Sequence, residues 1–236
     1  MRIDALSLDF FRNYVHLDAV FDPNINVIYG DNAQGKTNLL EAIACLSTGR
    51  SPRARSDREM IRFEADSALL RASVSARERN FVLETRLQRG RPKKMTVNGI
   101  SVRRGAQSSG VLFTVYFCPE DLFLIRDGAA ARRKLMDTAL CQLRPKYAQA
   151  LMRYNKAYES KTRILRDSEE RPDLLAALPE FNHQMALAGA TVIHYRAQFA
   201  ARLAEYAEAS HRECSGGRET LTLRYETVKT VTDPFA

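Results

Sequence analysis

The residue pattern with the most definite chemistry lies between positions 30 and 37. Glycines at two of these positions let backbone N–H groups face phosphate oxygens, a lysine reaches the β- and γ-phosphates, and a threonine hydroxyl ligates Mg²⁺. The sequence therefore predicts a nucleoside triphosphate site, with Mg²⁺ held through the nucleotide and Thr37. The complete G-x-x-x-x-G-K-T loop reads Gly30-Asp31-Asn32-Ala33-Gln34-Gly35-Lys36-Thr37.

The segments on either side of this loop are those that the chemistry requires. Residues 26–29, Asn-Val-Ile-Tyr, predict a buried strand before the loop, and residues 38–46 predict a helix that begins directly after it. A strand, a glycine-rich loop and a helix in this order place the positive end of the helix dipole at the phosphates. This context favours nucleotide binding over a purely structural glycine turn.

The composition indicates a globular protein of one or two domains. The chain has 236 residues, of which 45% are hydrophobic and 27% charged. Its four cysteines form no C-x-x-C pair, which favours reduced thiols in a cytoplasm. Asp4 and Asp9 stand where a signal peptide would be apolar, and the apolar runs are too short to span a bilayer. We therefore expect a cytoplasmic protein without a membrane segment.

Positive charge is concentrated rather than evenly spread. The net charge is +8, and no acidic residue occurs between Thr85 and Pro119, a stretch with seven lysines and arginines. A second cluster, of four arginines, lies at positions 50–58. Because a polyanion releases counterions when its phosphates are neutralised, such clusters favour sequence-independent DNA binding over an ordinary solvated face. The candidate DNA contacts flank a hairpin signal at Asn98-Gly99 and are Lys93, Lys94, Arg103 and Arg104.

Hydrophobic periodicity divides the chain into three parts. Residues 1–128 alternate as strands around the loop helix. Residues 129–215 repeat apolar positions at spacings of three and four on both sides of a polar bend at 168–179, which predicts two long antiparallel helices. Residues 216–236 contain an alternating stretch at 221–228, which predicts a strand that returns to the first part.

Several stretches together resemble the RecF family of DNA replication and repair proteins, within the SMC/Rad50 group of ABC-type ATPases. Residues 8–14, read as Leu-Asp-Phe-Phe-Arg-Asn-Tyr, and the phosphate loop resemble the N-terminal lobe of that group. Residues 117–122 resemble the family's Pro-Glu-Asp segment, and the run of Gly128, Arg132, Arg133 and Asp137 is similar to its G-x-x-x-R-R-x-x-x-D pattern. The resemblance covers most of the chain.

The resemblance implies a fold and a function. The fold would be α/β: the N-terminal lobe of a phosphate-loop ABC-type ATPase, with a mixed sheet around the loop helix and an α-helical arm. The ligands would be ATP, Mg²⁺ and DNA, at single-strand gaps or junctions between single and double strands. The partners would be RecR and RecO, indirectly RecA, which such proteins help to load, and a second copy of the same chain in an ATP-dependent homodimer.

Two parts of an ABC-type ATPase are not evident in the sequence. No apolar strand ends in Asp-Glu, because Pro119 separates the strand-like residues 111–117 from Glu120 and Asp121. Ser215-Gly216-Gly217 follows a helix instead of opening one, which is typical of a C-terminal cap rather than a signature motif. We therefore expect an N-terminal part of a longer polypeptide that binds ATP without hydrolysing it. The alternatives are a self-contained kinase or GTPase-like switch that uses Glu120 and Asp121 with Mg²⁺, and a DNA-binding scaffold whose loop no longer binds nucleotide.

Overall fold

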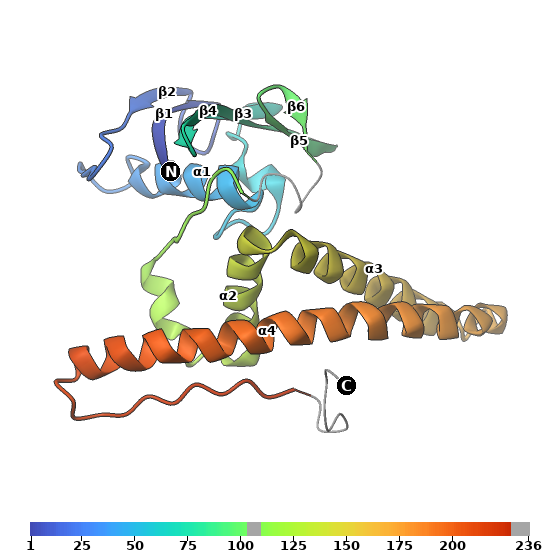
Figure 1. Ribbon diagram of the computed structural model, residues 1–236. Helices are drawn as coiled ribbons and strands as arrows, with labels where there is room; N and C mark the ends of the chain where they lie inside the picture. The colour runs from blue at the N-terminus through green and yellow to red at the C-terminus, as the bar shows by residue number, and fades with distance from the viewer. Residues whose placement is uncertain (103–109, 228–236) are drawn as a thin grey trace. The chain divides into compact units, whose positions relative to one another are not determined.

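The computed structural model describes residues 1–102 and 110–227 (Figure 1). The chain forms two compact units, one of residues 1–126 with 141–145, and one of residues 127–140 together with the chain from 146 onward. In the described part of the chain, no helix is long and apolar enough to cross a membrane.

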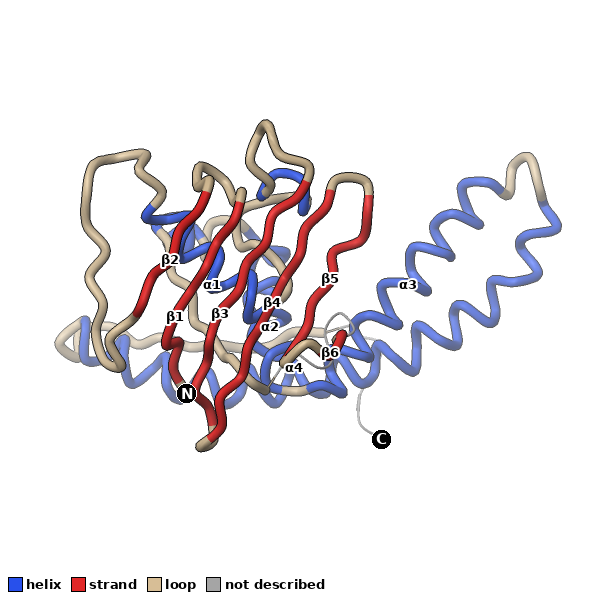
Figure 2. The backbone as a smooth tube through the Cα atoms, turned by 90° about the horizontal axis from the view of Figure 1, so that it is seen from above, coloured by secondary structure: helices blue, strands red, loops and turns tan. Residues whose placement is uncertain are grey.

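A six-stranded sheet is the centre of the first unit. Its strands lie in the order β2-β1-β3-β4-β5-β6 and every pairing is antiparallel. The red strands of Figure 2 show this arrangement. The α/β fold class is thus as expected, although the sheet contains no parallel pair among the described strands. The bounds are β1 (Arg2–Asp9), β2 (His16–Val20), β3 (Ser67–Ala76), β4 (Arg79–Gln88), β5 (Arg91–Val97) and β6 (Ile100–Ser101).

One face of the sheet carries the core of this unit. Helix α1 (Lys36–Thr48) buries Leu39, Ala42 and Leu46 in one cluster with apolar side chains of β1, β3 and β4. Along β3 the residues alternate between covered and open sides, since successive side chains of a strand point to opposite faces. Each fully buried leucine contributes about 1.5–3 kcal/mol, so this apolar face fixes the position of α1 and of the loop at its N-terminus.

The hairpin prediction at Asn98-Gly99 is confirmed. Asn98 has φ +50° and Gly99 has φ +78°, and the two residues join β5 to β6. Both central residues of such a two-residue turn need positive φ, which asparagine and glycine tolerate better than other residues.

Three stretches with strand-like sequences are not strands. Residues 26–29, residues 111–117 and the described part of the predicted C-terminal strand, residues 221–227, have no strand pairing. Val27 is 78% exposed, Tyr29 89% and Val115 fully exposed. A strand needs a neighbouring edge to satisfy its backbone, and the described sheet pairs none of these stretches. The expectation of a buried strand immediately before the phosphate loop is therefore wrong for this chain as described.

The second unit is helical. Helices α3 (Pro145–Asp167) and α4 (Leu178–Cys214) run antiparallel, because Tyr147 lies against Tyr195 while Tyr154 lies against Gly189 (Figures 1 and 2). A short 3₁₀ turn, η3 (Pro172–Ala177), lies between them. The antiparallel prediction is confirmed, but the first predicted helix is divided. Helix α2 (Gly128–Leu143) ends before Pro145, which begins α3 because proline disfavours a helical conformation at the residue before it.

A partly buried polar cluster joins the three long helices of this unit. The guanidinium of Arg196 donates to both carboxylate oxygens of Asp137 at 2.9 Å, and the hydroxyl of Tyr147 donates to the same carboxylate. Tyr147 is fully buried, and burial together with the Asp137 carboxylate raises the pKa of its hydroxyl. Asp137, a residue of the family-like run, thus has a structural role here because it fixes α2 to α3 and α4.

Candidate functional site

The phosphate loop has the backbone geometry of an anion site at a helix N-terminus. Gly35 caps α1 with φ +103°, and the loop residues 30–34 are exposed. The Lys36 ammonium lies on the loop itself, where it donates to the carbonyl oxygens of Gly30 at 2.7 Å and Asp31 at 2.6 Å. Thr37 is exposed in the first turn of the helix. Free N–H groups of the first helical turn, an ammonium and an accessible hydroxyl therefore lie close together.

The turn between β1 and β2 supports this loop through side-chain hydrogen bonds to its backbone. Asn13 Nδ2 donates to the Gln34 carbonyl at 3.1 Å, and the Tyr14 hydroxyl donates to the Gly35 carbonyl at 3.0 Å. A Cβ atom at Gly35 would lie 2.7 Å from Asn13 Oδ1 and 2.9 Å from the Tyr14 ring, distances that real Cβ atoms do not show. Gly35 is thus required both for its left-handed conformation and for this close approach.

The turn that supplies these contacts is itself strained and anchored. Phe10 and Arg12 have φ of +50° and +56°, a conformation that costs non-glycine residues energy and is kept only where surrounding contacts hold it. Those contacts are present: Arg12 N donates to Met60 O at 2.9 Å, Arg62 N donates to Phe10 O at 2.8 Å, and Phe11 is fully buried.

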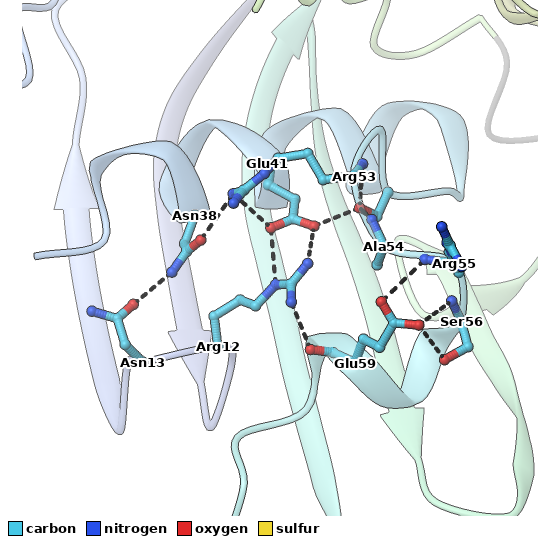
Figure 3. Close-up of polar contacts among 10 residues, drawn as sticks. Arg12, Asn13, Asn38, Glu41, Arg53, Ala54, Arg55, Ser56 and Glu59 are labelled. Carbon is cyan, nitrogen blue, oxygen red and sulfur yellow. Dashed lines mark hydrogen bonds and ion pairs between the residues drawn. The ribbon is translucent and has the colours of Figure 1, made fainter. Parts of the chain in front are cut away.

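A buried carboxylate connects the turn to α1. Glu41 is fully buried and lies one turn beyond Thr37 on the helix. Arg12 donates to both of its oxygens, at 2.6 and 3.0 Å (Figure 3). The Ser51 hydroxyl also donates to it, at 2.5 Å. Arg53 lies 3.5 Å from it. Three hydrogen bonds and one ion pair engage this carboxylate with protein groups, so it has a positioning role.

A series of polar contacts also connects the loop's surroundings to the arginine cluster at positions 50–58. Asn13 accepts from the Asn38 amide at 2.9 Å, and Asn38 Oδ1 accepts from Arg53 at 3.2 Å (Figure 3). Asn38 directly follows Thr37, so these contacts surround the first turn of α1. Sequence reasoning missed Arg12, Asn13 and Glu41 as supports of the site; their signal was the family-like stretch at residues 8–14 and the helix that follows the loop.

The two acids of the Pro-Glu-Asp segment have different surroundings. Asp121 caps the short 3₁₀ helix η2 (Pro119–Phe123), where its Oδ2 accepts from the Cys118 N–H at 2.9 Å and from the Cys118 thiol at 3.2 Å. The pKa of Glu120 is lowered by its own backbone N–H, by Cys118 and by the positive charge of Arg53. Glu120 therefore lies within the electrostatic reach of the arginine that contacts Asn38, whereas Asp121 is committed to its cap.

The two lysines predicted to contact DNA lie on opposite faces of β5. Lys94 is exposed, whereas the Lys93 side chain is 6% exposed and its ammonium pairs with Asp57 at 2.7 Å. Consecutive residues of a strand alternate in direction, so the expectation that the hairpin gathers both lysines on one surface is wrong for Lys93. Arg103 and Arg104 lie outside the described residues.

Other basic residues also separate into structural and exposed groups. Arg89 donates to the carbonyl oxygens of Ala65 at 2.8 Å and Phe63 at 3.1 Å, so it closes a loop. Arg53 is held by Glu41 and Asn38. Other exposed cations of the two basic clusters are Arg86, Arg91 and Lys94 on the sheet and Arg50, Arg55 and Arg58 near η1 (Asp57–Met60).

Fold and site together define a class: an α/β phosphate-loop domain whose loop is supported by a turn of the adjacent sheet and which carries a helical unit. A family model described as "AAA domain" matches residues 5–110.

The protein is 40% identical over 226 residues to the DNA replication and repair protein RecF of Agathobacter rectalis. This alignment covers 96% of this chain and 62% of the relative. It is 35% identical over 236 residues to the RecF protein of Bacillus subtilis, in an alignment that covers 100% of this chain and 64% of that relative. A solved structure described as the recombination mediator protein RecF-ATPrS in the RecFOR pathway matches with a TM-score of 0.86 and 31% identity, over 99% of this chain and 63% of that one.

The chain is thus a homologue of the RecF proteins along nearly its whole length, and it spans a little over three fifths of the curated relatives that it matches.

Proposed function

We propose that this chain binds ATP with Mg²⁺ at the loop of residues 30–37. The observation that carries the proposal is the geometry around Gly35 and Lys36: a left-handed glycine opens α1, and the lysine ammonium lies over the loop that precedes it. The residues fit the nucleotide, because N–H groups at the helix N-terminus and Lys36 suit phosphate oxygens and the exposed Thr37 hydroxyl suits Mg²⁺. Solved RecF structures described with ATP and ATPrS support the same assignment.

The proposal is tested by titrating a fluorescent ATP analogue into the chain and into Lys36→Ala. Loss of a charge-assisted contact costs about 1.5–3 kcal/mol, so we expect roughly 10- to 100-fold weaker binding. Lys156→Ala is the matched control, because Lys156 is an exposed lysine of α3. Thr37→Val should weaken binding only when Mg²⁺ is present, which tests the metal separately. Equal affinity of Lys36→Ala and the unchanged chain would refute the proposal.

We further propose that the nucleotide site serves a RecF-like role in recombinational repair and replication. The support is the similarity to RecF proteins along nearly the whole chain and the net charge of +8. The proposed partners are DNA, bound without regard to sequence at gaps or junctions, the RecO and RecR proteins of the RecFOR pathway, and RecA through them. The proposed location is the cytoplasm, and a second copy would join when ATP is bound to the longer protein.

We propose that this chain alone binds ATP without turning it over. Hydrolysis needs an acid that orients water and donors that stabilise the transferred phosphoryl group. Among the described acids considered for this role, Glu41 is occupied by Arg12, Ser51 and the ion pair with Arg53, and Asp121 is occupied by its cap. Steady-state phosphate release measures this directly: no release above that of Lys36→Ala is expected. Clear turnover dependent on Lys36 would instead favour the kinase or GTPase-like alternative, which the comparisons do not favour.

A further inference from the structure

The open face of the sheet, opposite α1, is divided by charge. In the strand register, His16 lies beside Asp9, Asp9 beside Leu69, Leu69 beside Arg86 and Arg86 beside Lys94. With strands about 4.8 Å apart, this row crosses five strands over about 19 Å. At the β2–β1 end, His16 lies between Asp9 at 2.7 Å and Asp18 at 3.0 Å, so two carboxylates face one imidazole and this end is acidic. The β4–β5 end is basic. A flat surface with this division favours an anion at one end and repels it at the other.

The basic end holds two cations that face each other across a strand pair. Arg86 and Lys94 are directly opposite in the register and both are exposed, and directly opposite residues place their Cβ atoms about 4.5–5.5 Å apart. Arg86 reaches an acid only at 3.7 Å, at Glu84, and that carboxylate already accepts from Arg71 at 2.9 Å. Like charges in this position destabilise a sheet. The surface therefore retains positive charge that an external anion would neutralise.

Shape and neighbours indicate which anion fits. The Arg86–Lys94 pair lies on an exposed sheet face, where Leu69 is opposite Arg86 and the next pair on this face along the same two strands is Glu84 with Thr96. A single small phosphate would gain few contacts on such a face, whereas a continuous polyanion adds contacts along its length and releases counterions at each one. Direct base reading needs an element that enters a groove, and this flat row presents none among the described residues, so the contacts would be to the backbone.

We propose that the open face of β4 and β5, centred on Arg86 and Lys94, is the surface that contacts the phosphate backbone of DNA. This inference rests on the proposed DNA-binding function and names the place where it acts. The acidic β2–β1 end, with Asp9 and Asp18, confines the backbone to the β3–β5 half of the face. The like-charge pair is retained at a cost in stability because bound DNA relieves it.

The test uses Lys94→Glu, which places opposite charges across the strand pair. The variant should be at least as stable as the unchanged chain, since an opposite-charge pair replaces a repulsive one. Its DNA affinity should nevertheless fall equally for two duplexes of unrelated sequence, and its plot of log K against log salt should be shallower by about one unit. Lys156→Glu on α3 carries the same charge change at an exposed site outside the sheet and should bind like the unchanged chain.

Fluorescence anisotropy between about 50 and 200 mM salt, with a thermal melt of each variant, separates the outcomes. Normal DNA affinity and slope in Lys94→Glu, while the unchanged chain binds, would overturn the surface assignment and leave DNA binding intact. An equal loss in Lys156→Glu would overturn it too, since net charge would then explain the effect. If the unchanged chain bound neither duplex at low salt, the proposed DNA binding itself would fail. If Lys94→Glu melted early, Lys94→Gln would provide the same test with a neutral side chain.

Discussion

Replacing Glu41 by glutamine isolates the charge that holds the phosphate loop's support in place. Glutamine has nearly the shape of glutamate, so the packing around α1 stays the same while one oxygen becomes an NH₂ group. Oε1 accepts from Arg12 at 2.6 Å and from Ser51 at 2.5 Å, while Oε2 accepts from Arg12 at 3.0 Å and forms an ion pair with Arg53 at 3.5 Å. In either orientation of the amide, the new NH₂ group faces donors that it cannot accept from. One hydrogen bond from Arg12 is therefore lost.

The size of the effect follows from burial. Removing one partner of a buried ion pair costs about 3–5 kcal/mol. Here the carboxylate is fully buried, but the Arg12 side chain is 22% exposed and that of Arg53 is 43% exposed, so water compensates part of the loss. We expect Glu41→Gln to lower the free energy of unfolding by about 2–3 kcal/mol, which is about 4–12 °C in the melting temperature of a chain of this size.

Thermal and urea unfolding of the whole chain, followed at the transition of the unit that contains α1, measure this change. Glu84→Gln is the control. Glu84 also accepts from an arginine, but on the open sheet face, so its substitution should cost less than about 1 kcal/mol. ATP affinity should fall in Glu41→Gln as well, because the displaced Arg12 belongs to the turn that holds the loop. Equal stability of the two variants would refute the reasoning, since the buried carboxylate would then contribute no more than a surface pair.

Three further changes give distinct expected outcomes. Gly35→Ala should abolish nucleotide binding and lower the melting temperature, because its Cβ would lie 2.7 Å from Asn13 Oδ1; retained ATP affinity would contradict this. Thr85→Val should raise the free energy of unfolding in urea by about 1 kcal/mol, since the buried Thr85 hydroxyl has no hydrogen-bond partner among the described residues; a loss of stability would show that the hydroxyl is satisfied. Hydrogen bonds to Asp9 and Asp18 raise the pKa of His16. The contribution of His16 to the free energy of unfolding is therefore fully present below its unfolded pKa of about 6.5, and it is lost as the pH rises through the higher folded value. His16→Gln should therefore cost more stability at about pH 5.5 than at about pH 8.5, and a cost that is equal at both would argue against the charged pair.

Features specified by neighbouring residues could be predicted from the sequence. The phosphate loop and its helix follow from the G-x-x-x-x-G-K-T spacing, and the β5–β6 hairpin follows from Asn98-Gly99. The antiparallel helices α3 and α4 follow from the period of their apolar residues. In each case the physical cause lies within one turn or one helix, so a short window of sequence contains it.

Features that depend on distant partners could not be predicted. A stretch such as residues 26–29, Asn-Val-Ile-Tyr, has the composition of a strand, but a strand forms only where another edge accepts its hydrogen bonds. Lys93 and Lys94 have the same charge, but they point to opposite faces of the strand, and only Lys93 lies against Asp57. Glu41 reads as an ordinary helical acid until a turn 29 residues earlier brings Arg12 against it.

These long-range contacts determine what the loop can do. The turn at residues 10–14 holds the backbone of Gln34 and Gly35, and Glu41 holds the turn, so the loop is fixed by groups that are already satisfied before a nucleotide arrives. Such preorganisation lowers the cost of binding phosphates, because little has to move. It provides no group that becomes more favourable as the γ-phosphoryl is transferred, since among the described residues the buried acid beside the loop already has its donors. Interactions of equal strength in the ground state and the transition state improve binding without accelerating the reaction. The arrangement of these residues therefore supports an ATP-binding role for this chain more directly than a hydrolytic one.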